Sequence, residues 1–72
     1  MDEKKARHIL AEYNESIDTC QENLRNMNLR LYTCKESEKV WYLENIKKEK
    51  EKLEIEEQEK EAFINKYSSL IR

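Results

Sequence analysis

The sequence predicts an all-α fold: a two-helix antiparallel hairpin with helices at about residues 2–33 and 37–71, in a single domain spanning residues 1–72. Three observations support this prediction. The 72 residues include no Gly and no Pro, and 42% of them are Asp, Glu, Lys or Arg, so helix formers dominate. Apolar residues in the first half recur at helical spacing. That pattern shifts after residue 34, which predicts a chain reversal near the middle.

An unbroken apolar heptad stripe, which we call the seam, runs along the first predicted helix. Its members alternate between heptad positions a and d, and they are the candidate interaction residues of the chain: Leu10, Tyr13, Ile17, Cys20, Leu24, Met27 and Leu31. Cys34 extends the pattern, while Asp2 and Glu3 suit the helix start, where the helix dipole favours anions. A strand cannot use this spacing because its faces alternate every two residues. The seam therefore predicts a helix that packs one face against another helix.

The second half has a different heptad frame, shifted by one residue from the first. Its apolar members are Ile46, Leu53, Phe63, Tyr67 and Leu70. A shift of one residue turns an apolar stripe by about 100°, whereas coiled coils absorb insertions of three or four residues. The simplest cause is a turn between Thr33 and Glu38. Thr33 and Glu36 match a capping box, and Ser37 is a second candidate N-cap. One long coiled-coil helix and a partly disordered chain are the alternatives.

The middle of the second predicted helix offers the seam few apolar partners. In the predicted hairpin, residue i faces roughly residue 71 − i. Leu24 then faces Lys47, and Ile17 faces Leu53 and Glu54. Burying a Leu or Ile side chain is worth about 1.5–3 kcal/mol, so we expect the seam to take a further apolar cover. That cover is a second copy, in a dimeric four-helix bundle or coiled coil, or a groove on a partner protein.

The two cysteines predict a reducing compartment. Cys20 and Cys34 lie 14 residues apart, about 21 Å along a straight helix, which is too far for a disulfide within it. Free thiols at seam positions predict a cytoplasmic protein, and an intermolecular disulfide across a parallel dimer is the alternative. The start of the chain does not match a signal peptide. The longest apolar run, residues 40–43, is far too short to span a membrane, so no membrane contact is expected.

Motifs that carry chemistry are missing from the sequence. The one histidine, His8, has no second ligand at metal-binding spacing, and there is no HExxH, CxxC, GxSxG or P-loop pattern. We therefore predict a protein that is not an enzyme and that holds no cofactor and no metal. Trp41 and Tyr42 beside the predicted turn are candidate binding anchors, because Trp and Tyr dominate interface hot spots. The competing interpretation is that this pair caps a small core.

The charge balance gives little support to nucleic-acid binding as an alternative function. The net charge of −2 is too small to imply a nucleic-acid or membrane partner. Arg25, Arg30 and Lys35 form a loose basic strip, which Glu22 and Glu36 partly neutralise. A dimeric helical hairpin that binds nucleic acid as a transcriptional regulator is the alternative that this strip supports.

Three segments carry a resemblance to a known family. Residues 5–13 (KARHILAEY) open the first helix, residues 37–40 (SEKV) open the second, and residues 63–70 (FINKYSSL) close it. In these segments the chain resembles small phage regulators of late transcription, the RinA/ArpU kind. It lacks the C-terminal helix-turn-helix that such proteins use on DNA. The resemblance implies a protein-binding or dimerisation piece of such a regulator, or a small phage protein that blocks a host factor.

Taken together, the sequence predicts a small adaptor, regulator or inhibitor. Such a protein works by protein–protein interaction through the seam, as a homodimer or on a different partner protein.

Overall fold

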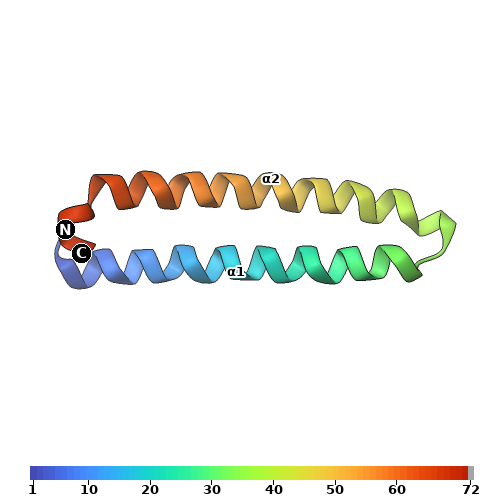
Figure 1. The fold of residues 1–72 in the computed structure, drawn as a ribbon, viewed down its shortest axis with the longest axis horizontal. Helices are drawn as coiled ribbons and strands as arrows, with labels where there is room; N and C mark the ends of the chain where they lie inside the picture. Colours follow the sequence, from blue (N-terminus) through green and yellow to red (C-terminus); the bar gives the residue numbers. More distant parts are fainter. Residues whose placement is uncertain (72) are drawn as a thin grey trace.

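The computed structural model describes residues 1–71, and its elements follow the order α1 (Glu3–Thr33), α2 (Glu36–Lys66) and α3 (Ser68–Ile71). α1 and α2 run antiparallel and side by side, joined by a tight turn, and α3 lies at the opposite end beside the start of α1 (Figure 1). The body is 51 Å long and only 15 and 14 Å across. The predicted all-α hairpin is therefore confirmed, and the alternative of one continuous helix is wrong.

The first helix begins as its sequence predicts. Asp2 is the N-cap, and its side-chain oxygen accepts a hydrogen bond of 2.7 Å from the backbone N–H of Lys5. Glu3 forms an ion pair of 2.6 Å with Arg7, which lies one turn further along α1. α1 continues without interruption to Thr33, where Cys34 turns to extended backbone and donates its N–H to the carbonyl of Arg30 at 2.8 Å.

The turn is capped differently from the prediction. The Thr33 hydroxyl donates back to the Arg30 carbonyl at 3.4 Å, so this residue completes the last turn of α1. Lys35 takes the N-cap position of α2 and makes no side-chain cap bond, while Ser37 lies inside the helix. The predicted capping box and the second candidate N-cap are therefore both wrong. Glu36 and Glu38 stabilise this helix start through the helix dipole.

The second long helix ends earlier than the predicted boundary at residue 71. α2 stops at Lys66, and Tyr67 leaves the helical region with φ −117° and ψ 28°. The N–H of Tyr67 still donates to the carbonyl of Phe63 at 3.0 Å. After this bend, α3 contacts both long helices, and its Leu70 and Ile71 side chains are half-buried. The apolar end of the chain thus folds over the end of the hairpin.

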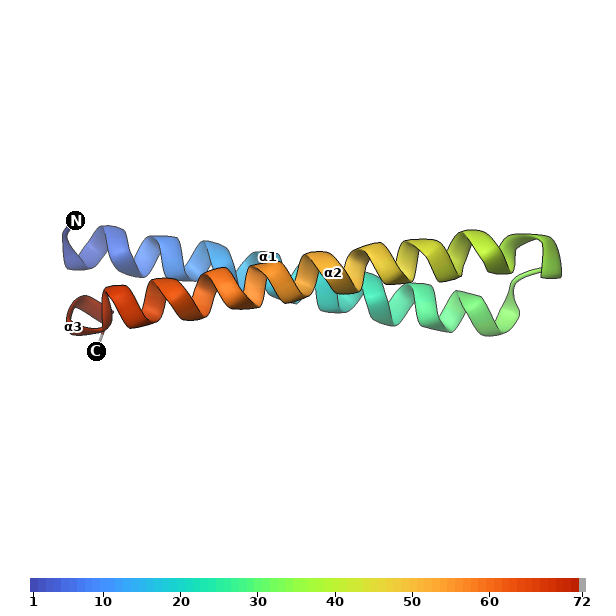
Figure 2. The same ribbon diagram turned by 90° about the horizontal axis from the view of Figure 1, so that it is seen from above.

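The core is a narrow strip between the two long helices, which cross at a shallow angle (Figure 2). Four hydrophobic residues in it are buried: Ala6, Ile17, Cys20 and Ile46. The second heptad frame is confirmed as the inner face of α2, because all its apolar members are buried or half-buried. No helix within residues 1–71 is long and apolar enough to cross a membrane.

Two isoleucines make a matched test of this packing. Ile17 is 7% exposed in the core, whereas Ile55 is 55% exposed on α2. We expect I17A to lower the free energy of unfolding by about 2 kcal/mol, because it removes buried methyl groups. I55A should change it by less than about 0.5 kcal/mol, because a surface position loses little on truncation. Urea unfolding followed by circular dichroism measures both values, and equal losses would contradict the packing described here.

Candidate interaction surfaces

The described side chains form no arrangement suited to metal chemistry. Within residues 1–71, no group of three or more His, Cys, Asp or Glu side chains is placed to hold a metal ion. His8 lies 3.2 Å from Glu12 one turn along α1, and both side chains are largely exposed.

The structure places the whole seam on the face of α1 that meets α2. All seven predicted seam residues are covered to some degree, but only Ile17 and Cys20 are buried. The others are half-buried: Leu10, Tyr13, Leu24, Met27 and Leu31. The seam therefore holds the hairpin together and also keeps apolar surface open to solvent along both edges of the interface.

Charged side chains of α2 lie opposite the middle of the seam. Cys20 is 1% exposed and is surrounded by the charges of Glu49, Lys52 and Glu56. Burial raises the pKa of the Cys20 thiol above its ordinary value of 9.0, and Glu49 acts in the same direction through a hydrogen bond and its charge. Asn23 donates to the same Glu49 carboxylate at 3.5 Å. The inner face of α2 thus carries charged residues where the seam is most buried.

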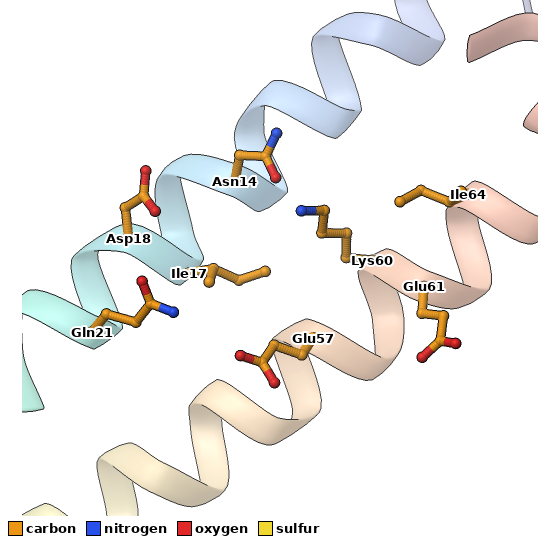
Figure 3. Close-up of a pocket in the computed structure, with 8 residues that line it drawn as sticks. All are labelled: Asn14, Ile17, Asp18, Gln21, Glu57, Lys60, Glu61 and Ile64. Carbon is orange, nitrogen blue, oxygen red and sulfur yellow. The ribbon is translucent and has the colours of Figure 1, made fainter. Parts of the chain in front are cut away.

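The cover of Ile17 comes from polar residues with long aliphatic stems. Ile17 lines an open groove with Glu57, Lys60 and Ile64, and it is directed toward α2 while Lys60 reaches toward α1 (Figure 3). Lys and Glu side chains cover apolar surface with their methylene groups and keep their charges in water. The expectation that this part of the seam needs a further cover is therefore wrong for Ile17, which is already buried within the single hairpin.

An aromatic cluster closes the end of the hairpin next to α3. The ring of Tyr13 lies 5.9 Å from that of Phe63, and Phe63 lies 5.0 Å from Tyr67. Tilted ring pairs at such distances stabilise beyond the area they bury. Phe63 and Tyr67 are thus partners of the seam that belong to the fold.

The candidate anchors Trp41 and Tyr42 lie in the first turns of α2 and differ in exposure. Their rings pack edge to face with centroids 4.9 Å apart. Tyr42 is half-buried at the interface with α1, whereas Trp41 is 58% exposed. Both line an open groove with Met27 and Arg30. Tyr42 therefore belongs to the core end, and Trp41 presents most of its indole ring to solvent.

The turn end also exposes apolar side chains that the candidate sites from the sequence did not include. They are Leu29, Tyr32, Val40 and Leu43, which are between 55% and 89% exposed. Each helix contributes a pair spaced three residues apart, so the members of a pair lie on one side of their helix. The sequence alone could have identified these four residues, because they are apolar and lie outside both heptad frames.

The basic residues behind the nucleic-acid alternative do not form one surface. Arg25 and Arg30 are both exposed on α1, but five residues separate them, which places them about 140° apart around the helix. Lys35 lies in the turn beside the exposed Glu36. A phosphate backbone binds a continuous basic surface, so this distribution favours a protein partner over a nucleic acid.

Comparison with known proteins identified no relative of this chain. No model of a protein family, no curated protein and no solved structure matches this chain. The resemblance to phage regulators therefore stays a prediction.

The two free cysteines give a test of the seam position of Cys20. We expect a thiol reagent to label the half-buried Cys34 in the native protein and to label Cys20 only through unfolding. Because the folded pKa of Cys20 is raised above 9.0, the thiol favours the fold at lower pH, and this contribution is lost as the pH rises past 9.0. The alkaline loss of stability should be smaller in C20A than in the unmodified protein. Equal labelling rates for the two native thiols would place Cys20 at the surface instead.

Proposed function

We propose that this chain works by protein–protein contact without chemistry of its own, and that its partner is a second copy that covers the open edges of the seam. The pair forms a four-helix assembly, and it acts as an adaptor, regulator or inhibitor in the cytoplasm. The free thiols of Cys20 and Cys34 fit a reducing compartment of that kind.

One observation carries the proposal: most of the seam is only half covered. Five of its seven members keep part of their surface in water although the hairpin is fully formed. Apolar area removed from water stabilises by about 25 cal/mol per Å², so a neighbour along these edges gains free energy. Small domains rarely obtain enough from one core, and association is a common remedy when no disulfide or metal is present.

The dimensions of the hairpin agree with this use. A specific interface removes about 800 Å² from each partner. The hairpin exposes 5800 Å² in all, and one long face is 51 Å long and 15 Å wide. One face therefore supplies the area that a stable dimer needs. The exposed Tyr32, Val40 and Leu43 at the turn end add apolar contact area to it.

The test is the mass of the protein in solution. The single chain has a mass of 8.8 kDa, and we expect sedimentation equilibrium to give twice that mass at the upper end of a range from about 5 to about 500 µM, since association obeys mass action. Circular dichroism across the same range should show more helix, or a higher melting temperature, as the dimer forms. A monomer at every concentration, fully helical and with a constant melting temperature, would contradict the homodimer. The seam edges would then be available to a different protein.

A further inference from the structure

We infer that the second copy packs on one particular long face of the hairpin, in an antiparallel orientation set by two segregated rows of charge. The inference rests on the proposed self-association, and it adds the face that is used and the direction in which the copies lie. Its basis is the order of charges along α2 and α1.

The first row consists of seven residues of α2 that are spaced alternately four and three apart. This spacing places them along one side of the helix. From the turn toward α3 the row reads Leu43, Lys47, Lys50, Glu54, Glu57, Glu61 and Ile64. Its five charged members are exposed. Within this row the half near the turn is basic, the half near α3 is acidic, and an apolar residue stands at each end. Beside the row, Glu51 lines the groove of Lys47 and Lys50, and Lys60 lines that of Glu57 and Glu61.

The neighbouring side of α1 repeats the same order. Tyr32, Arg25 and Asp18 follow one another at intervals of seven residues, which is the spacing of one heptad position. They again read apolar, basic and acidic from the turn outward. Asp18 lines the same groove as Glu57 and Glu61, and Lys60 reaches toward α1 between the two helices (Figure 3). We call the surface made by both rows the charged face.

The charges of this face are available to an outside partner. Within the described part of the chain, the ion pairs join Glu3 with Arg7, His8 with Glu12 and Glu36 with Lys39. None of these pairs uses a member of the charged face. At the turn end, Leu43 lines a second open groove with Lys47 and Lys50. The exposed Val40 precedes Leu43 by three residues on the same side of α2.

A face with one basic half and one acidic half is complementary to itself when a copy is turned end for end. A two-fold axis across the middle of the hairpin brings Lys47 and Lys50 toward the Glu61 and Glu57 side chains of the second copy. The same rotation brings Leu43 toward Ile64. A parallel arrangement would place basic on basic and acidic on acidic, which like-charge repulsion disfavours. Glu54 lies at the centre, where its two copies face each other, so E54Q should strengthen association.

The experiment compares charge reversals by sedimentation equilibrium at low ionic strength. K47E/K50E makes the whole row on α2 acidic and should weaken self-association at least about tenfold, because four intermolecular contacts change from attraction to repulsion. The full exchange K47E/K50E/E57K/E61K restores opposite charges in the antiparallel dimer and should return association to within about threefold of the unmodified protein. At about 1 M salt the differences should shrink, because the Debye length falls to about 3 Å.

The matched control is K48E, which is set against K47E and changes an exposed neighbouring lysine outside the charged face. It should associate like the unmodified protein, and all variants should keep full helicity. If K47E and K48E weaken association equally, or if the full exchange restores nothing, the assigned face and orientation are wrong while self-association stands. If the unmodified protein stays a monomer at every concentration, the homodimer and this arrangement fail together.

Discussion

The packing of the α1 seam against the inner face of α2 is the interaction on which the rest of the structure depends. The seam is apolar along its whole length, whereas the inner face of α2 is apolar near both ends and, apart from Leu53, polar between them, where Glu49 and Glu56 lie near Cys20. Ile17 and Cys20 are nevertheless buried between the two helices, beside Lys and Glu residues of α2. This packing excludes water from two seam residues and leaves the other five half exposed.

This mismatch connects the fold to the proposed function. A helix pair with a fully apolar interface would bury its own seam and have little need of a neighbour. Here five seam residues stay half exposed on either side of the buried Ile17 and Cys20, and the turn end exposes Tyr32, Val40, Trp41 and Leu43 as well. The ordered charges on one long face then supply orientation, since electrostatic complementarity contributes specificity more than affinity.

The sequence is sufficient to predict the hairpin but not the manner in which the seam is covered. Heptad spacing locates the inner face of α1, and the shifted frame locates that of α2 through Ile46, Leu53 and Phe63. The cap at Lys35 and the break at Tyr67 are local choices that no motif marks. The burial of Ile17 does not follow from classing residues as polar or apolar. Lys60 is polar, yet its methylene stem is apolar and only its terminal amino group needs water. The exposed apolar residues at the turn end lie outside both frames, so periodicity alone did not select them.

The most direct measurement is the stability of a hairpin whose polar middle has been made apolar. In E49L/E56L the inner face of α2 becomes apolar opposite the seam, and E44L/E51L is the control at two exposed positions with the same spacing. Urea unfolding should show E49L/E56L more stable than the unmodified protein by about 1–3 kcal/mol, because apolar side chains at these half-buried positions add apolar burial against the seam. The measurement should be made at a concentration where every variant is monomeric, and the control should change little. A value for E49L/E56L equal to or below that of the unmodified protein would contradict the account, because the polar residues would then not limit the stability of the hairpin.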